Sequence, residues 1–464
     1  MYKKNDVLEL DILDQGNSGE GIGKVDGYAI FIKDAIIGDR VKVKIMKAKK
    51  NYAFGKLLEV LKPSSFRANP KCDVSTSCGG CQIQEMCYER QLKFKWDKVY
   101  NNIKRIGGIE NFKMKDIIAA DSQYFYRNKA QFPVREDRDG NIIYGFFAGR
   151  THSIVKCESC ALGLKVEGKD FYNKIMNIII NFMNEYKIKA YNEIKNTGLV
   201  RNVLIRIGQR TGEIMVCIII NGNKLPNSEK LVKKLCEIEA IKDISISINK
   251  TKGNTIMGDK VISLYGPGYI EDFIGNVKFR ISAKSFYQVN PMQTYKLYSK
   301  ALEYANLTGN ELVWDLYCGI GTISLFLAKK AKKVIGVEIV DAAVENAKEN
   351  AKINNIENAE FLVGAAEDVV SEYYSSNSDD AMKTPDVIVV DPPRKGCDEK
   401  LIETMLKMNA NRIVYVSCDS ATLARDLKIL CENGYNIREV TPCDMFPNTT
   451  HVESVCLLSK GNIC

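Results

Sequence analysis

The chain has 464 residues, of which 27% are charged and 45% hydrophobic, as in a soluble globular protein of about two to four domains. No apolar run approaches the roughly 18 residues that a membrane helix needs, and the first residues lack the apolar core of a signal peptide. We therefore expect a cytoplasmic protein with no membrane partner. The net charge of +9 is compatible with a polyanionic partner but does not require one.

Residues 1 to about 62 alternate short apolar strands with glycine-containing turns, a pattern that predicts a small β-barrel. In the segment KVKIMKAKKNYAFGK, lysines interleave with the aromatic residues Tyr52 and Phe54. A barrel that binds single-stranded nucleic acid has this combination. A solvated, lysine-rich edge strand has it as well, so the residues alone leave both interpretations open.

Fifteen cysteines occur in the chain, and in a reducing cytoplasm we do not expect them to form disulfides. The segment KCDVSTSCGGCQIQEMC brings Cys72, Cys78, Cys81 and Cys87 close together in sequence. C-x-x-C with further cysteines nearby predicts a metal site. Taken in isolation, these four cysteines could hold zinc or a [4Fe–4S] cluster. At such density, a group of reduced cysteines without metal is the weaker interpretation.

From residue 91 to about 285 the chain mixes strands, such as LVRNVLIRIG, with helical stretches, which predicts an α+β region. Within it, YFYRNKAQFPVRED combines Arg127 and Lys129 with Phe125, Tyr126 and Phe132. This combination suits phosphate contact and base stacking. Ordinary strand residues with solvated charges account equally well for any one of these positions.

From about residue 290 strands and helices alternate, which predicts a parallel sheet of βαβ units. The strand ELVWDLY runs into Cys318-Gly319-Ile320-Gly321, and the next strand, KVIGVE, ends on Glu338. Glycines at such a turn let a ligand approach the backbone, and an acid about 20 residues later suits ribose hydroxyls. Asp315 precedes the glycines, and the third glycine of a dinucleotide site is missing. The loop resembles that of class I S-adenosylmethionine-dependent methyltransferases more than that of nicotinamide enzymes.

A second acidic strand end follows in PDVIVVDPPRKG, where an apolar strand ends in Asp391-Pro392-Pro393-Arg394. Open α/β sheets bind ligands at the carboxyl ends of their strands, although Asp-Pro turns are also common by themselves. Methyltransferases that act on exocyclic amines usually carry an aromatic residue after the two prolines. Arg394 stands at that position, which argues against amine chemistry.

The stretch VYVSCDSATLARDL places Cys418 just past an apolar strand instead of inside it. A buried cysteine usually lies within the apolar run and behaves as a small hydrophobe. A cysteine at the sheet end that still packs in the core is the competing interpretation.

Five stretches together, SFYQVNP, DLYCGIGT, DPPRKG, VSCDSATLARDL and MFPNTTHVESV, resemble the uracil-C5 RNA methyltransferase family. Its members make 5-methyluridine in ribosomal or transfer RNA, and the match covers nearly the whole chain. The resemblance implies a multi-domain fold in which the first two domains bind RNA. The expected domains are a TRAM (OB-like) β-barrel over 1–62, an α+β central domain with an iron–sulfur cluster over 63–285, and a Rossmann-like class I methyltransferase domain over 286–464.

The family's functional residues carry over one at a time. Cys418 matches the nucleophile and Glu453, in HVES, matches the general base. The residues that match S-adenosylmethionine contacts are Gln288, Tyr317, Glu338 and Asp391. The family often reads Ser-Cys-Asn-Pro, whereas Asp419 and Ser420 follow the cysteine here. This departure bears on loop rigidity and charge, because a carboxylate beside a thiol tends to raise the pKa of the thiol.

The resemblance also favours iron–sulfur over zinc. It implies a [4Fe–4S] cluster on Cys72, Cys78 and Cys81 with a distant fourth ligand. Cys160 sits at the family's distance from SIV, and Cys157 is its rival. Cys87 falls where the family tolerates a residue that is not a ligand. The C-x3-C-x2-C spacing of radical enzymes is absent, so we expect a structural or RNA-facing cluster.

The chemistry of uracil explains why such an enzyme needs Cys418 outside the core. Carbon 5 of uracil is too weakly nucleophilic to take a methyl group unaided, and a thiolate that adds to carbon 6 activates it. A base must then remove the carbon 5 proton, and Glu453 is the candidate. The target base must also leave its helix, so base flipping or a single-stranded loop is implied.

We therefore expect a monomeric, S-adenosylmethionine-dependent RNA uracil-5-methyltransferase. The preferred substrate is 23S ribosomal RNA, because the bacterial transfer-RNA branch typically lacks the barrel and the cluster. Some cluster-bearing relatives act on transfer RNA, which makes a tRNA enzyme the alternative. An RNA cytosine-5-methyltransferase would carry a Pro-Cys motif after the acidic strand, where only Cys397 occurs, at a distance. A non-enzymatic iron–sulfur sensor would not need Cys418, Glu453 and an intact glycine loop together.

Overall fold

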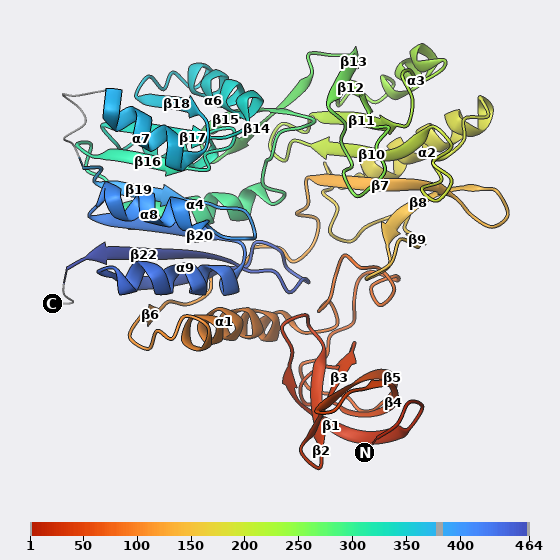
Figure 1. Cartoon of the computed structure of the whole chain (residues 1–464). Helices are drawn as coiled ribbons and strands as arrows, with labels where there is room; N and C mark the ends of the chain where they lie inside the picture. The colour runs from red at the N-terminus through yellow and green to blue at the C-terminus, as the bar shows by residue number, and fades with distance from the viewer. Residues whose placement is uncertain (1, 377–383, 462–464) are drawn as a thin grey trace. The chain divides into compact units, whose positions relative to one another are not determined.

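The computed structural model describes residues 2–376 and 384–461 (Figure 1). Its contacts divide the chain into two compact units, each discontinuous in sequence. The first unit comprises Met1–Lys98, Phe146–Val155 and Phe446–His451, and the second comprises Val99–Gly145, Lys156–Met445 and Val452–Cys464. No helix in the described part of the chain is both long enough and apolar enough to cross a membrane. The domain boundaries expected at residues 62 and 285 stay predictions.

The N-terminal strands of the first unit form a closed barrel in the order β1-β2-β3-β5-β4, which confirms the predicted β-barrel. These strands are β1 (Val7–Gln15), β2 (Gly21–Val25), β3 (Tyr28–Lys33), β4 (Arg40–Ala48) and β5 (Tyr52–Lys62). Alternate side chains of a strand point to opposite faces. Accordingly, Ile30, Ile32, Val41, Val43 and Ile45 are fully buried and fill the barrel.

Three aromatic side chains share the outer face of β3 and β5. The parallel register pairs Phe31 with Phe54 and Ala29 with Tyr52. The ring centroids of Tyr52 and Phe54 are 5.5 Å apart, and Phe31 lies 5.7 Å from Tyr52 and 5.9 Å from Phe54. Tyr52 and Phe54 are exposed, so the aromatic residues that the sequence interleaves with lysines do lie at the surface.

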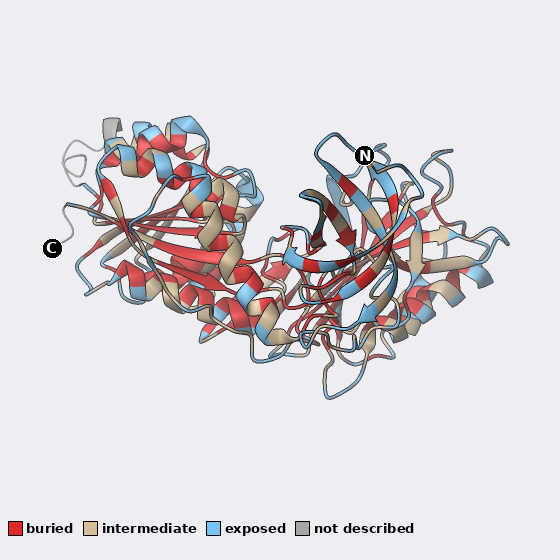
Figure 2. Ribbon diagram, turned by 90° about the horizontal axis from the view of Figure 1, so that it is seen from below, coloured by how far each residue is buried: buried red, intermediate tan, exposed pale blue. Residues whose placement is uncertain are grey.

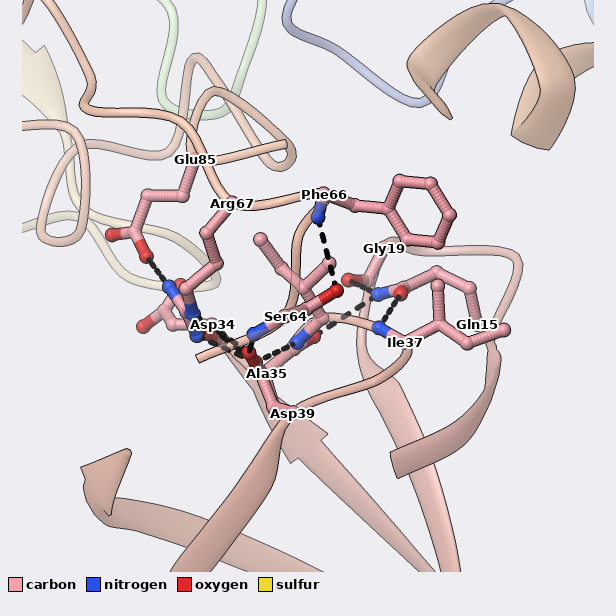
Figure 3. Close-up of polar contacts among 11 residues, drawn as sticks. Gln15, Gly19, Asp34, Ala35, Ile37, Asp39, Ser64, Phe66, Arg67 and Glu85 are labelled. Atoms are coloured by element: carbon pink, nitrogen blue, oxygen red, sulfur yellow. Dashed lines mark hydrogen bonds and ion pairs between the residues drawn. The ribbon is translucent and has the colours of Figure 1, made fainter. Parts of the chain in front are cut away.

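Residues 63–87, the cysteine-rich segment, connect β5 to helix α1 (Tyr88–Arg105) through turns and isolated bridges. An ion pair fastens the segment to the barrel (Figure 3). Arg67 donates to the fully buried carboxylate of Asp39 over 2.8 to 3.1 Å and to Glu85 over 2.6 Å. Asp39 also accepts from the backbone N–H groups of Ile36 and Ser64, each over 2.8 Å. Because a buried carboxylate is costly unless it is paired, these contacts fix where the segment leaves the barrel.

The middle of the chain contributes a seven-stranded mixed sheet in the order β13-β12-β11-β10-β7-β8-β9. Its strands are β7 (Lys129–Glu136), β8 (Ile142–Phe147), β9 (Ile154–Lys156), β10 (Val200–Ile207), β11 (Ile214–Ile220), β12 (Ile241–Ile248) and β13 (Lys260–Tyr265). Helices α2 (Phe171–Glu185) and α3 (Ser228–Leu235) accompany it, and β14 (Tyr269–Ile274) pairs with β15 (Val277–Ser282). Helices and a mixed sheet agree with the α+β region expected here.

The C-terminal part forms an eight-stranded sheet in the order β18-β17-β16-β19-β20-β22-β21-β6. Its strands are β16 (Leu312–Leu316), β17 (Lys333–Glu338), β18 (Ala359–Val363), β19 (Val387–Val390), β20 (Arg412–Ser417), β21 (Tyr435–Cys443), β22 (Glu453–Lys460) and the short β6 (Lys113–Met114). β16 to β20 are parallel, and β22 runs antiparallel to β20. This is the Rossmann-like arrangement predicted for the methyltransferase domain.

Helices cover both faces of this sheet. Residues 99–105 of α1 share one hydrophobic cluster with α7 (Ala366–Ser376), α8 (Glu399–Met408) and α9 (Ser420–Glu432). The other face meets α4 (Pro291–Ala305), α5 (Thr322–Ala328) and α6 (Asp341–Ile353). Figure 2 shows the buried residues running along the strands while the exposed residues lie on the outer sides of the helices. Because helices cover both faces of the sheet, a ligand can bind at the ends of the strands.

Candidate active site

The candidate residues gather at the carboxyl edge of the eight-stranded sheet. The chain passes from β16 outward to β18 and then returns to place β19 on the other side of β16, so the strand order reverses between β16 and β19. Ligands of open α/β sheets bind in the crevice at such a reversal. Asp315 lies near the end of β16, Asp391 directly follows β19, and Cys418 directly follows β20.

The strand register brings Cys418 and Glu453 together. Antiparallel pairing of β20 with β22 joins Ser417 to Ser454, so the next residues in register are Cys418 and Glu453. Glu453 is 3% exposed and Cys418 is half-buried. On its other side Glu453 pairs with Cys443 of β21. A carboxyl group and a thiol that lie 35 positions apart in sequence (453 − 418) are thereby held at one site.

Burial disfavours ionisation of all three acidic groups at this edge. It raises the pKa of Glu453 to about 8, with the nearby Asp391 adding to the effect, and the pKa of Asp391 to about 7. The pKa of the Cys418 thiol is raised to about 12, mainly by burial and to a smaller extent by the charges of Glu453 and Asp391. The thiol of the free protein is therefore protonated at neutral pH, and a positive charge near it would favour the thiolate.

Arg394 supplies such a charge. Its guanidinium lowers the pKa values of both Cys418 and Glu453 against the larger effect of burial. The backbone N–H of Gly396 donates to the carbonyl of Pro393 over 2.8 Å, and the Thr422 hydroxyl donates to the Arg394 carbonyl over 3.2 Å. The sequence analysis used this arginine only to exclude amine chemistry. A cation in the loop that follows β19, at the reversal of strand order, was the signal for its wider role.

The departure from the family's Ser-Cys-Asn-Pro pattern has a local role in the fold. Asp419 is the N-cap of α9, where its carboxylate accepts from the N–H groups of Ala421 and Thr422 over 2.9 and 3.2 Å. Ser420, which is 3% exposed, accepts a hydrogen bond from Asn102 of α1 over 2.8 Å. Because Asp419 and Ser420 both make specific contacts, the segment after Cys418 is held without a proline.

The glycine loop after β16 has the backbone geometry of a ligand-binding turn. Tyr317 and Gly319 have φ angles of 71° and 55°, in the left-handed region, and a Cβ at Gly319 would meet no atom within 4 Å. A ligand can thus approach the backbone at Gly319. Glu338, at the end of β17, accepts from the N–H groups of Gly319 and Val340 over 3.2 and 3.0 Å. Tyr317 and Glu338 therefore flank the same loop.

Asp315 offers an acceptor that the protein does not satisfy. Its side chain is fully buried, and Oδ2 accepts from the Ser324 hydroxyl, but Oδ1 has no hydrogen-bond partner among the described residues. Burial raises the pKa of Asp315 to about 7, with Asp391 contributing. A buried acceptor without a partner is costly, and a ligand amine or hydroxyl at this edge would satisfy it. The arrangement fits the cofactor class that the sequence implies.

Gln288 lies just before α4, the helix that packs against β20 and β22. The side chain of Gln288 is 7% exposed, and its backbone carbonyl accepts from the Asn128 side chain over 3.1 Å. Tyr298 of α4 shares a hydrogen bond of 3.1 Å with Thr322, at the start of α5. After burial itself, Asp391 is the largest of the influences that raise the pKa of Tyr298. Tyr298 therefore brings the middle of α4 to this edge of the sheet, and the cofactor contact expected of Gln288 stays a prediction.

The predicted cluster ligands are divided between the two units. Cys72, Cys78 and Cys81 belong to the first unit and Cys160 to the second. Cys160 is half-buried, like these three and Cys87, whereas its rival Cys157 is buried. The backbone N–H of Gly80 is directed at the Cys78 sulfur over 3.4 Å, and four thiols are the usual donor set of a [4Fe–4S] cluster. Within the described residues, however, no three His, Cys, Asp or Glu side chains are grouped so as to hold a metal ion. The cluster stays a prediction.

The aromatic and basic segment at 124–137 divides into core and surface. Tyr126 and Phe132 are each 3% exposed, so for them the ordinary strand interpretation holds. Phe125 is exposed and has a φ of 56°. Burial, together with two nearby arginines, lowers the pKa of Lys129 to about 8. The ammonium group of Lys165 lies 4.4 Å from the centroid of the Phe125 ring, so a stacking role for Phe125 stays a prediction.

Comparisons with known proteins agree with this geometry. The family model for tRNA (Uracil-5-)-methyltransferase matches residues 87–461, and the model for the TRAM domain matches residues 3–58. The chain belongs to the tRNA (uracil-5-)-methyltransferase family. It is accordingly an RNA methyltransferase with an N-terminal TRAM domain, which confirms the family that the sequence resembles.

Several relatives span almost the full length of this family member. A Bacillus cereus protein described as an uncharacterized RNA methyltransferase is 47% identical over 459 residues, covering 99% of this chain and 97% of its own. A Clostridium acetobutylicum protein of the same description is 46% identical over 461 residues, covering 99% and 98%. The crystal structure of Pyrococcus abyssi tRNA (uracil-54, C5)-methyltransferase in complex with S-adenosyl-L-homocysteine is similar with a TM-score of 0.76 and 28% identity, covering 97% of this chain and 99% of that one.

Proposed function

We propose that this RNA methyltransferase methylates carbon 5 of uridine in 23S ribosomal RNA through a covalent adduct with Cys418. The observation that carries the proposal is the register between β20 and β22, which pairs a half-buried cysteine with a buried glutamate at the carboxyl edge of the sheet. A nucleophile and a base are the two groups that this reaction demands of the protein.

In the proposed mechanism, the Cys418 thiol first releases its proton to solvent, a step that the nearby charge of Arg394 favours. The thiolate then adds to carbon 6, and the electron pair of the C5–C6 double bond makes carbon 5 nucleophilic enough to take the methyl group. S-adenosylmethionine supplies that methyl group and, when bound, a positive charge. Glu453 then takes the carbon 5 proton in its ionised form, which the charge of Arg394 favours against the effect of burial. The electron pair of that C–H bond forms the C5–C6 double bond, the C6–S bond breaks, and the thiolate is restored.

We assign Gln288, Tyr317, Glu338 and Asp391 to the S-adenosylmethionine site. Tyr317, Glu338 and Asp391 are supported by their position at the glycine loop and the reversal of strand order, whereas Gln288 rests on the family resemblance. The unsatisfied oxygen of Asp315 is an additional acceptor for a ligand donor. Glu338, an acid at the end of the second strand of the domain, suits ribose hydroxyls. Calorimetric titration with S-adenosylmethionine tests this assignment, and Glu338→Ala is expected to weaken binding while thermal stability is retained.

The RNA substrate has two candidates. The 23S ribosomal RNA is supported by analogy, because the bacterial transfer-RNA branch of the family typically lacks the barrel and the cluster. The exposed Tyr52 and Phe54 beside lysines would provide a stacking surface for single-stranded RNA. Transfer RNA is favoured by a different observation, since the archaeal enzyme that matches nearly this whole chain is named for uracil 54 of tRNA. The target RNA is decided by incubating the protein with S-adenosylmethionine and unmodified 23S rRNA or tRNA, and measuring 5-methyluridine by mass spectrometry. Product in tRNA alone would overturn the ribosomal proposal and keep the chemistry.

We also propose a [4Fe–4S] cluster on Cys72, Cys78, Cys81 and Cys160. Protein purified without oxygen should contain about four iron and four sulfide ions per chain, as this cluster type requires. Cys78→Ser should lose most of both, and Cys87→Ser should lose neither. Comparing Cys160→Ser with Cys157→Ser identifies the fourth ligand. Stoichiometric zinc without sulfide would contradict the iron–sulfur assignment.

A further inference from the structure

The loop Phe446–His451, which leads into β22, belongs to the first unit although its neighbours in sequence belong to the second. Asn448, at its centre, is fully buried and has a φ of 69°, a left-handed conformation that asparagine tolerates better than most residues. Its backbone N–H donates to Oε1 of Gln91 over 2.8 Å, and its side-chain oxygen accepts from Nε2 of Gln91 over 3.1 Å. Its carbonyl accepts from the backbone N–H groups of Gln82 and Ile83 over 3.1 and 3.2 Å.

Two lysines of α1 hold the rest of the loop. Lys95 is fully buried, and its ammonium group donates to the carbonyl of Phe446 over 2.9 Å. Lys98, one turn later, donates to the carbonyl of Thr450 over 3.0 Å. Burying a lysine is costly unless its charge is well solvated by protein groups, so this arrangement is more than ordinary surface packing. Helix α1 thus supplies three side chains, those of Gln91, Lys95 and Lys98, to one loop.

Glu453 comes two residues after this loop ends. Val452 and Glu453 are each 3% exposed, so the chain enters the core of the second unit immediately. One residue spans at most about 3.3 to 3.6 Å, which leaves little slack between His451 and Glu453. Glu453 is also the first residue of β22, so a change in the path of the loop would act on the end of the strand, where the ladder is least able to resist it.

We infer that Gln91 and Asn448 are positioning residues for Glu453, holding the loop on the path that lets the carboxylate reach the carbon 5 proton. Gln91 is the central element, because it binds both the backbone and the side chain of Asn448 and is itself fully buried on α1. The inference rests on the proposed function, since it concerns the release step of that reaction. Neither residue lies in the stretch of the methyltransferase domain that carries the glycine loop, the acidic strand end and the nucleophile.

The inference makes a step-specific prediction. If Glu453 is displaced, the Cys418 thiolate can still add to carbon 6 and carbon 5 can still take the methyl group. The carbon 5 proton then stays in place, the C6–S bond cannot break by elimination, and the methylated RNA remains attached to the protein. A loop variant should therefore accumulate a covalent, denaturant-resistant RNA adduct that carries the methyl group. A general loss of folding would instead reduce adduct formation and release together.

The test is a single-turnover reaction of the full-length protein with radiolabelled S-adenosylmethionine and the RNA that the wild type methylates. Denaturing gels separate label in the protein–RNA adduct from label in free RNA. Gln91→Met keeps the volume of the side chain and removes its hydrogen bonds to Asn448. We expect it to slow release about 10-fold to 100-fold, the size of effect caused by misplacing a catalytic group by about 1 Å. Methyl incorporation into the adduct should stay near the wild-type rate.

Three further variants make the result interpretable. Glu453→Gln gives the largest accumulation of adduct that the assay can detect. Gln15→Met is the matched control, because Gln15 also lies in the first unit and bonds to backbone groups, but at Gly19, Ala35 and Ile37 of the barrel (Figure 3). It should release RNA as the wild type does. Lys98→Ala, at a half-exposed position, should fold normally and show a smaller accumulation than Gln91→Met.

Each outcome decides one point. Adduct accumulation in Gln91→Met and Lys98→Ala, but not in Gln15→Met, supports the inference. Normal release in Gln91→Met and Lys98→Ala, with accumulation in Glu453→Gln, overturns the positioning role and leaves the proposed function intact. If Glu453→Gln accumulates no adduct and Cys418→Ala still methylates RNA, the proposed function itself is wrong.

Discussion

The sheet edge that carries Asp391, Cys418 and Glu453 is built from regular strands, whereas the cysteine-rich segment 63–87 is built from turns and isolated bridges. At the sheet edge, backbone hydrogen bonds determine which residues face each other before any ligand binds. In the cysteine-rich segment, individual contacts such as Arg67 with Asp39 hold the backbone, and the thiols have no ladder to set their spacing. The proposed catalytic site is thus preformed by topology, whereas the proposed cluster would couple metal binding to the folding of its segment.

The largest effect that this comparison predicts is the loss of the nucleophile at the preformed edge. Cys418→Ala should reduce 5-methyluridine formation by about four to six orders of magnitude, because the proposed reaction depends on addition of this thiolate to carbon 6. Cys431→Ala, at another half-buried cysteine of the same unit, should retain activity and serves as the control. Nucleoside mass spectrometry of the RNA measures both variants. Methylation by Cys418→Ala at more than a small percentage of the wild-type rate would contradict covalent catalysis.

The second effect concerns the contacts that hold the cysteine-rich segment. Asp39→Ala leaves the Arg67 guanidinium without its buried partner and should destabilise the first unit by about 3 to 5 kcal/mol, as measured by urea unfolding. Asp11→Ala removes an exposed ion pair of 3.6 Å with Arg40 on the same barrel and should cost less than about 1 kcal/mol.

Measuring S-adenosylmethionine binding by Asp39→Ala shows whether the sheet edge is independent of the cysteine-rich segment. It should survive Asp39→Ala, because Asp39 and the assigned cofactor residues lie in different units. Loss of cofactor binding together with the stability of the first unit would show that the sheet edge depends on the barrel. The view that the sheet edge is preformed independently of the first unit would then be wrong.

Some features of these two regions could be predicted from the sequence and others could not, and the reason is physical. The barrel and the alternating sheet followed from strand and helix periodicity, and the motifs at strand ends located the glycine loop, Asp391 and Cys418 at one edge. The pairing of Cys418 with Glu453 needed the register of an antiparallel strand, which periodicity does not supply. The role of Gln91 needed a contact across 357 residues of sequence. No local pattern encodes such a partner.

Substitution of Arg394 tests how a nearby positive charge affects the ionisation of Cys418 and Glu453. Its charge lowers the pKa values of both Cys418 and Glu453, so removing it in Arg394→Met should raise both. At neutral pH the thiolate fraction falls, and each unit of pKa costs about tenfold in that fraction. We expect activity near pH 7 to drop about 10-fold to 100-fold and the rising limb of the pH–rate profile to move to higher pH. Arg394→Lys, which keeps the charge, should shift the profile less, and a vertical loss without any shift would argue for a contact with RNA instead.

The smallest effect comes from the other end of α1. Asn102 donates to Ser420 over 2.8 Å, two residues after Cys418, so Asn102→Leu removes one hydrogen bond that holds the nucleophile's loop. A single hydrogen bond contributes about 1 kcal/mol, which corresponds to about a fivefold slower formation of the covalent adduct. Asn101→Leu, at the neighbouring position, is the control.

The step that the variant slows is more informative than the size of the rate change. Gln91→Met should trap the adduct, whereas Asn102→Leu should slow its formation without trapping it, although the two residues belong to the same helix. If both variants trap the adduct, or neither does, then α1 acts as a uniform support and does not serve the two catalytic residues separately. Opposite behaviour would mean that a helix outside the βαβ units acts on both steps of the reaction, each through its own hydrogen bond.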